Sequence, residues 1–185
     1  MPFVSDYSIT PTVVLASYIL KDYLNDLGID SYVEKRSIKS YLDKKNLSYY
    51  YCYDASRYYM MDAKKEYDFE YYIDLHRDSA KKKSTLYQDG KKKYARIMFV
   101  VGLNHASSSK NLKFVETINS IINKKYKGLS RGIYKRDDVR FNQDVSPHAI
   151  LLELGGVDNT LEEINNTLEV FAEVLNEYME ASNGS

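Results

Sequence analysis

The sequence predicts an α/β fold in which a mainly parallel sheet is flanked by helices and carries one antiparallel hairpin strand. Amphipathic helical segments alternate with short apolar runs along the chain, which is typical of layered α/β proteins. Residues 97–101 are apolar on both faces, as expected for a strand inside a sheet. Asp89-Gly90 lies between two strand-like segments and is a strong short hairpin signal.

Length and charge limit the classes of function. The 185 residues are expected to form a single domain, residues 1–185, with a substantial core. The 26 basic and 26 acidic residues cancel, so no overall field attracts nucleic acid or an anionic bilayer. No apolar run approaches the roughly 20 residues of a membrane helix, and no cleavable signal is visible, so no membrane segment is expected. The single cysteine, Cys52, excludes an internal disulfide, and we expect a structural thiol.

The N-terminal part of the chain is predicted to be mostly helical. Its apolar residues recur at helical spacing up to Gly28, a residue type that commonly ends helices. The predicted elements are a helix starting at Pro11 with Thr10 as N-cap, a short strand at residues 29–33, a short helix at residues 37–42, and a helix at residues 55–66 with Asp54 as N-cap.

The rest of the chain alternates strands and helices. Thr160 and Glu163 form a capping box, in which each side chain satisfies a backbone donor of the other residue. The predicted elements are a buried strand at residues 71–75, hairpin segments at residues 84–87 and 93–101, a helix from the serines at 107–109 to Gly128, a strand at residues 131–135, a polar loop at residues 137–147, a strand at residues 149–153, and a final helix after Thr160.

Polar side chains follow two of these strands. The first strand runs into His76, Arg77 and Asp78, and the second ends at Glu153 before two glycines. Ligands of open α/β sheets gather at the carboxyl ends of strands, where polar side chains converge on solvent. We therefore predict that His76 and Glu153 lie at neighbouring strand ends and face one site.

These two residues permit a metal-assisted hydrolysis of an amide. A neutral imidazole is a good zinc ligand, and a carboxylate across the site can take a proton from metal-bound water. Two other readings stay open. His76 could be a structural hydrogen-bonding group, because catalytic zinc usually takes three protein ligands. Glu153 could form a salt bridge with Arg77 or Arg131, because an unpaired buried carboxylate is costly.

Other features carry less information about function. His105 and His148 fall in predicted loops without ligand spacing and are expected at the surface. The lysine runs at residues 81–83 and 91–93 are expected to be solvated ends of the hairpin. A nucleotide-binding α/β protein would need a glycine-rich phosphate loop between its first strand and helix, and no such loop is present.

Five segments in series resemble the stage II sporulation protein P family. They cover nearly the whole chain in order and are YIDLHRDS at 72–79, YARIMFVVG at 94–102, KYKGLSRGI at 125–133, NQD at 142–144 and LELGGVDNT at 152–160. The resemblance implies a zinc-dependent N-acetylmuramoyl-L-alanine amidase fold. Such enzymes cut the amide between the lactyl group of muramic acid and L-alanine, and family members are also associated with cleavage of peptide cross-bridges.

The resemblance also implies a setting and partners. Family members act in engulfment by spore-forming Firmicutes or in cell-wall turnover, and they are membrane-anchored. By this likeness we expect an extracytoplasmic, cell-wall-facing location. The expected partners are peptidoglycan stem peptides, glycan strands and other sporulation proteins.

Site residues follow from the same resemblance. His76 would be a zinc ligand, and Glu153 would be the catalytic carboxylate that activates water. The residues expected to contact substrate or support the site are Arg77, Asp78, Arg131 and Asn142.

One departure from the family pattern affects the expected activity. In the family, a first strand ends in a Thr-His-x-(Thr/Gln)-x-Glu-like motif that supplies the other two zinc ligands, upstream of the helix that begins here near Pro11. This chain has no histidine before His76. We therefore expect an N-terminally incomplete domain with an incomplete zinc site, weak zinc binding and no activity of this chain alone. The alternative is a non-catalytic module on the same fold that binds peptidoglycan or a protein partner through Arg77, Arg131 and the loop around Asn142.

Overall fold

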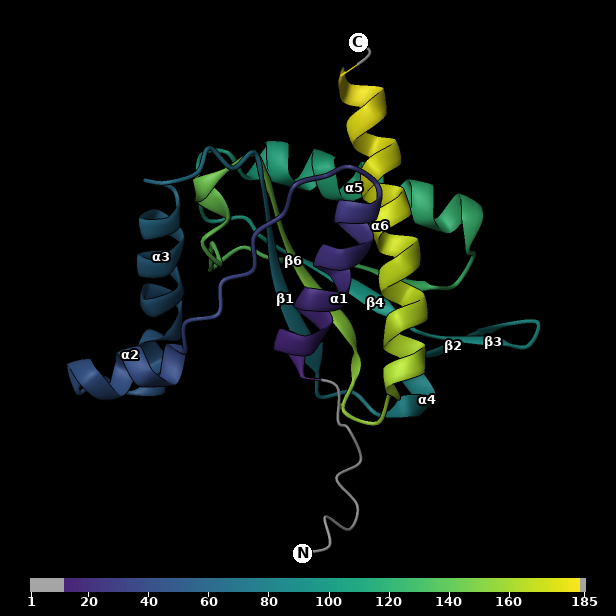
Figure 1. Cartoon of the computed structure of the whole chain (residues 1–185), viewed down its shortest axis with the longest axis horizontal. Coiled ribbons are helices and arrows are strands. Elements are labelled where there is room, and N and C mark those ends of the chain that lie inside the picture. Colours follow the sequence, from purple (N-terminus) through teal and green to yellow (C-terminus); the bar gives the residue numbers. More distant parts are fainter. Residues whose placement is uncertain (1–11, 184–185) are drawn as a thin grey trace, which may run out of the picture.

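The computed structural model describes residues 12–183 and has the expected α/β architecture (Figure 1). The predicted cap at Thr10 and first turn at Pro11 lie outside these residues; the described cap of the first helix is Thr12, whose side chain accepts a hydrogen bond from the Leu15 amide at 3.1 Å. The elements are α1 (Val13–Asp26), α2 (Ile38–Lys45), η1 (Tyr49–Tyr51), α3 (Cys52–Ala63), β1 (Tyr71–Asp78), α4 (Lys82–Thr85), β2 (Leu86–Asp89), β3 (Lys92–Ala95), β4 (Ile97–Gly102), α5 (Ser108–Lys125), β5 (Ser130–Arg136), η2 (Gln143–Val145), β6 (His148–Gly156) and α6 (Leu161–Asn183).

The central sheet has four strands in the order β1-β6-β4-β5. The pairs β1–β6 and β4–β5 are parallel, while β4 and β6 run antiparallel. The strands β2 and β3 form a separate antiparallel hairpin, in which Gly90 takes the positive φ of 56° that the tight turn requires. The predicted mixture of a mainly parallel sheet and an antiparallel hairpin is therefore confirmed.

One hydrophobic core lies between one face of this sheet and the helices α1, α5 and α6. Alternate residues of the strands, such as Phe99 and Leu152, meet Ile118 of α5 and Phe171 of α6, and all four side chains are fully buried. Each such side chain contributes about 1.5–3 kcal/mol when it leaves water. The opposite face carries the intervening residues; Val100 and Leu151 are buried there as well, whereas Glu153 is partly exposed.

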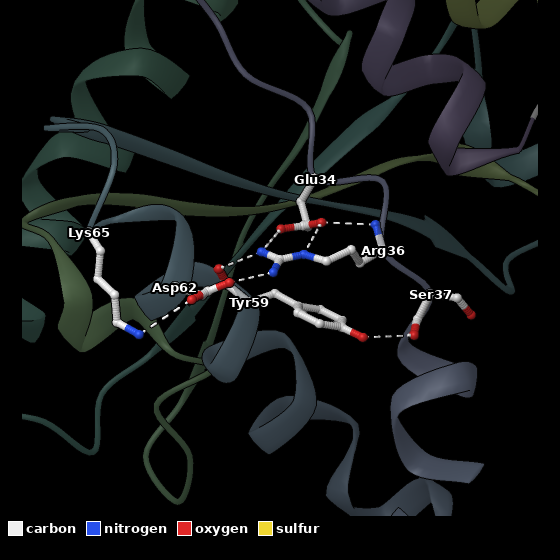
Figure 2. A network of polar contacts seen from close by, with 6 residues as sticks. All are labelled: Glu34, Arg36, Ser37, Tyr59, Asp62 and Lys65. Carbon is white, nitrogen blue, oxygen red and sulfur yellow. Dashed lines mark hydrogen bonds and ion pairs between the residues drawn. The ribbon is translucent and has the colours of Figure 1, made fainter. Parts of the chain in front are cut away.

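The segment α2–η1–α3 stands to one side of the helices that cover the core (Figure 1). A polar network fastens the preceding linker to α3 (Figure 2). The Arg36 guanidinium donates to Glu34 at 2.9 and 2.6 Å and to Asp62 at 2.5 Å, and it lies 4.4 Å from the ring centre of Tyr59. The Tyr59 hydroxyl in turn donates to the Ser37 carbonyl at 3.3 Å.

The predicted strand at residues 29–33 is wrong, because this segment makes no ladder in the described sheet. The amides of Gly28 and Ile29 donate to the carbonyls of Asn25 and Leu24, which closes α1 in a Schellman motif. The following Tyr32 ring packs against Tyr67, 5.4 Å between centroids, rather than joining a strand. Residues 29–33 are therefore held by side-chain packing and not by hydrogen bonds to a neighbouring strand.

Several other predicted boundaries differ: the strand predicted at residues 71–75 extends to Asp78, and the strand predicted at residues 149–153 runs from His148 to Gly156. Residues 84–85 belong to the short helix α4, and the predicted strand at residues 93–101 is interrupted at Arg96. The Arg96 amide donates to the Thr85 carbonyl and its carbonyl accepts from Gly155, so the chain passes there from the hairpin to the central sheet. The predicted helix at residues 55–66 begins earlier, at Cys52, which places Asp54 in its first turn rather than at its cap, and ends at Ala63.

Candidate functional site

His76 and Glu153 are direct neighbours across the parallel β1–β6 ladder. Paired residues of adjacent strands project from the same face, so both side chains leave the sheet on the side opposite the core. Glu153 lies three residues inside β6 rather than at its last residue, and the ladder becomes irregular just after His76. The structure thus brings these two residues together close to the carboxyl ends of their strands.

Glu153 is a half-buried carboxylate with one buried oxygen that has no hydrogen-bond partner. Its Oε2 atom is inaccessible to solvent and has no hydrogen-bond partner. Burial raises the pKa of Glu153, the charge of His76 opposes that rise, and the negative charges of Asp78 and Asp74 add to it. A raised pKa makes this carboxylate a better proton acceptor than an ordinary glutamate.

His76 is held by a carboxylate on its own strand. Its Nε2 atom lies 3.0 Å from Oδ1 of Asp74, two residues earlier on the same face. This hydrogen bond raises the pKa of His76, against burial, and the charges of Asp74 and Glu153 act in the same direction. A histidine that binds a metal through one nitrogen usually donates from the other to a carboxylate, so this contact fits both a structural and a ligating role.

Arg131 and Asp78 form an ion pair that bridges the two outer strands of the sheet. Nη2 of Arg131 on β5 lies 2.5 Å from Oδ2 of Asp78 on β1, and both side chains are less than one-fifth exposed. Burial would raise the pKa of Asp78, but the hydrogen bonds from Arg131 and from the Ala80 amide hold it below its usual value. Arg131 also lowers the pKa of Glu153, so the pair lies near that carboxylate without binding it.

Arg77 is directed away from this group. Its guanidinium donates to the carbonyls of Gly156 and Val157 at 3.1 and 2.5 Å, and it lines a small cavity with residues of α1 and α6. The alternative prediction, a salt bridge from Glu153 to Arg77 or Arg131, is therefore not confirmed. Arg77 donates to backbone carbonyls, and Arg131 pairs with Asp78.

Asn142 fastens α3 to the rest of the molecule. It adopts a left-handed backbone conformation with φ of 57° and is only 6% exposed. Its side-chain amide donates to the Tyr53 carbonyl at 2.8 Å and to Ser56 Oγ at 3.0 Å. The structure thus gives Asn142 a role in positioning α3, and its contact with substrate stays a prediction.

Tyr53 is a candidate site residue that the sequence does not reveal. Burial raises the pKa of its phenol, and the negative charges of Asp74 and Glu153 raise it further. Its ring packs against Phe141, with centroids 5.5 Å apart. Tyr53 lies in a run of five residues that contains four tyrosines, so no local signal distinguishes it.

Potential metal donors are few in the described part of the chain. Residues 12–183 contain no group of three or more histidine, cysteine, aspartate or glutamate side chains placed to hold a metal ion. His105 contacts Ser107, with 3.2 Å between Nδ1 and Oγ, and His148 begins β6 instead of lying in the predicted loop. The described donors near Glu153 therefore do not complete a catalytic zinc site, which usually has three protein ligands.

The fold and this polar face define a mixed α/β protein with a carboxylate–imidazole pair beside an ion pair. The family model for stage II sporulation protein P matches residues 4–176, and the chain belongs to that family. Stage II sporulation protein P of Bacillus subtilis (strain 168) is 39% identical over 170 residues, which cover 89% of this chain and 42% of that protein. The chain thus spans less than half the length of this curated relative. No solved structure matches it.

Proposed function

We propose that this chain carries the catalytic carboxylate of a peptidoglycan hydrolase of the N-acetylmuramoyl-L-alanine amidase type, acting in sporulation or cell-wall turnover. Family membership and the name of the Bacillus subtilis relative support the sporulation role. The observation that carries the chemistry is the buried, unpartnered oxygen of Glu153 beside His76.

Glu153 acts as the general base and acid in this proposal. Its raised pKa brings the proton affinity of the carboxylate closer to that needed at neutral pH. It takes a proton from the water that attacks the amide carbonyl and returns a proton to the nitrogen that leaves. The burial of Oε2 keeps this oxygen free of competing solvent.

The surrounding charges suit a peptide with carboxylates and amides. Arg131 has a buried Nε without a hydrogen-bond partner, and it is already oriented by Asp78. It contacts the stem peptide in this proposal, while Tyr53 lines the same face from α3. Arg77 supports the carbonyls at the end of β6. Such a substrate places the protein on the wall-facing side of the membrane, beside other sporulation proteins.

Zinc dependence rests on the family resemblance alone. His76 would contribute one ligand, but the described donors do not supply a set of three. We expect this 185-residue chain to bind zinc weakly and to hydrolyse muropeptides only when further ligands are supplied.

No described helix is long and apolar enough to cross a membrane.

The test compares this chain with a version extended upstream in the same gene. Zinc content, zinc affinity and muropeptide hydrolysis are measured for both proteins. We expect tight binding of one zinc and hydrolysis only in the extended protein. In that protein Glu153→Gln abolishes hydrolysis and keeps the zinc, His76→Ala loses both, and the control Glu162→Gln, an exposed residue of α6, changes neither. Retained activity of either site variant removes the role proposed for that residue.

A non-catalytic binding module is the second candidate. The lack of a three-ligand group among residues 12–183 favours it. It predicts that muropeptides bind both proteins without being hydrolysed, and that a chelator leaves their affinity unchanged. Metal-dependent hydrolysis by the extended protein would exclude this candidate.

A further inference from the structure

A second pocket lies at the opposite end of β6 from the candidate site. Its volume is about 350 Å³, and it opens between α5, α6 and the residues that begin β6. Small-ligand pockets start at about this size. Its lining residues are Lys110, Lys113, Phe114, Thr117, Pro147, His148 and Tyr178.

This pocket is separate from the Glu153 site in two respects. His148 precedes Glu153 by five residues in β6, which corresponds to about 16 Å along a strand. His148 also shares the sheet face of Ile150 and Leu152, whereas Glu153 projects from the opposite face. A small ligand in this pocket therefore cannot also contact Glu153.

The wall of the pocket is aromatic. The His148 ring stacks on Tyr71, with centroids 4.8 Å apart and planes at 19°. Phe114 meets His148 edge-on at 5.2 Å and lies 4.8 Å from Tyr178. Such faces bind flat or apolar groups through area and ring contacts. The body of a matching ligand is therefore flat or apolar.

The rim of the pocket is positively charged. Lys110 and Lys113 are exposed, three residues apart on α5, and they line the pocket together. Within residues 12–183 neither lysine makes an ion pair, whereas Lys125 on the same helix binds Glu177. These two ammonium groups are thus available to an anion.

His148, which lines the pocket, has one buried polar atom. Nδ1 of His148 is inaccessible to solvent and has no hydrogen-bond partner. The nearest acid is Glu70, whose Oε1 lies 3.6 Å away, beyond hydrogen-bond distance, on a side chain that is 65% exposed. Glu70, which immediately precedes β1, thus faces His148 without a hydrogen bond to it.

We propose that this pocket binds a small anion, a carboxylate or a phosphate monoester, attached to a flat or apolar body. The body lies against Phe114, Tyr178 and His148, and the charge meets Lys110 and Lys113. This site does not depend on the amidase proposal.

Nuclear magnetic resonance of the histidine rings tests the proposal on the 185-residue chain. The chain has three histidines, so the signals of His76, His105 and His148 can be assigned. The probes are benzoate and phenyl phosphate, with benzamide as the neutral match and inorganic phosphate as the charge without a body. We expect benzoate or phenyl phosphate to shift the His148 signals at millimolar concentration while those of His76 stay in place.

Charge variants provide the second arm. Lys110→Gln combined with Lys113→Gln should weaken the anionic probe about tenfold, because two exposed charge contacts are lost. Lys124→Gln, an exposed lysine near the end of α5, should leave the affinity unchanged. The relative strength of the two anionic probes separates a carboxylate ligand from a phosphate ligand.

Four results would overturn the proposal. They are shifts confined to His76, equal binding of benzamide, an affinity unaffected by the two lysine substitutions, and no binding of either anionic probe in the millimolar range. A loss of muropeptide hydrolysis in Glu153 variants has no bearing on these outcomes. The two proposals can therefore fail separately.

Discussion

Glu153 faces His76 because the apolar residues around them fix the register of the β1–β6 ladder. Ile73 pairs with Ile150 and Leu75 with Leu152, and all four contact the core. A slip of one residue would turn this apolar set to the polar face, so the register is strongly specified. The core residues of the two strands thus place the carboxylate beside the imidazole without any direct bond between them.

The ionised form of Glu153 should lower stability. Glu153→Gln removes the charge of a half-buried carboxylate whose Oε2 is buried without a partner, so we expect the free energy of unfolding at pH 7 to rise by roughly 1 kcal/mol. Because the folded-state pKa is raised above 4.5, the cost appears only above about that pH and vanishes below it. Urea denaturation at pH 7 and pH 4 measures the difference, and a destabilised variant at pH 7 would contradict it.

The Arg131–Asp78 pair should be costly to break from one side. Asp78→Asn leaves a largely buried guanidinium without its charge partner, and we expect a loss of about 3 kcal/mol in urea denaturation. Adding Arg131→Gln should restore part of the loss. Asp138→Asn, which breaks the exposed pair with Arg136, is the matched control and should cost less than about 1 kcal/mol. Equal losses of stability for Asp78→Asn and Asp138→Asn would show that burial does not strengthen the Arg131–Asp78 pair.

Asn142 should act on α3 through its side chain and its backbone. Asn142→Gly keeps the left-handed conformation and removes the hydrogen bonds to Tyr53 and Ser56, for an expected loss of about 1–2 kcal/mol. Asn142→Ala should lose about 1 kcal/mol more, because an alanine is strained at this φ. Hydrogen exchange should become faster in α3 and stay unchanged in α6. Unchanged protection of α3 in the glycine variant would refute the anchoring role.

Local patterns in the sequence were sufficient to predict several helices, turns and caps. The capping box forms as predicted, with the Thr160 amide 3.0 Å from Glu163 Oε2 and the Glu163 amide 3.3 Å from Thr160 Oγ1. The hairpin at Gly90 and the apolar faces of α5 and α6 were also readable, because each depends on residues close in sequence. The pairing of His76 with Glu153 followed from a general property of strand ends.

Contacts between segments that are distant in sequence could not be predicted from the sequence. The strand predicted at residues 29–33 has the right composition, but its aromatic ring packs on Tyr67 and it joins no strand of the described sheet. Arg131 on one edge strand of the sheet binds Asp78 on the other edge strand, and the two residues are 53 positions apart in sequence. Asn142 donates to the Tyr53 carbonyl of α3, although the two residues are 89 positions apart in sequence. Such relationships depend on tertiary structure and leave no periodic signal.

Glu163 should give the protein an acid-sensitive junction between β6 and α6. Its side chain is 4% exposed and its Oε1 lies 2.9 Å from Lys82 Nζ, while its Oε2 accepts from Nδ2 of the Asn159 side chain at 2.9 Å. Burial would raise the pKa of Glu163, but these bonds and the Thr160 amide hold it below its usual value of 4.5. Its stabilising contribution is therefore complete above that pH and is lost as the pH falls through the folded-state pKa.

The corresponding variant is Glu163→Gln. We expect it to lose about 2 kcal/mol at pH 7, because charge-assisted hydrogen bonds to Lys82 and to the helix cap become neutral ones. The difference from the parent should shrink as the pH is lowered below 4.5, since the parent carboxylate is then protonated as well. Urea denaturation between pH 7 and pH 3 measures this convergence, with Glu162→Gln as the exposed control on the same turn. A difference that stays constant with pH would mean that the side chain acts through its shape and not through its charge.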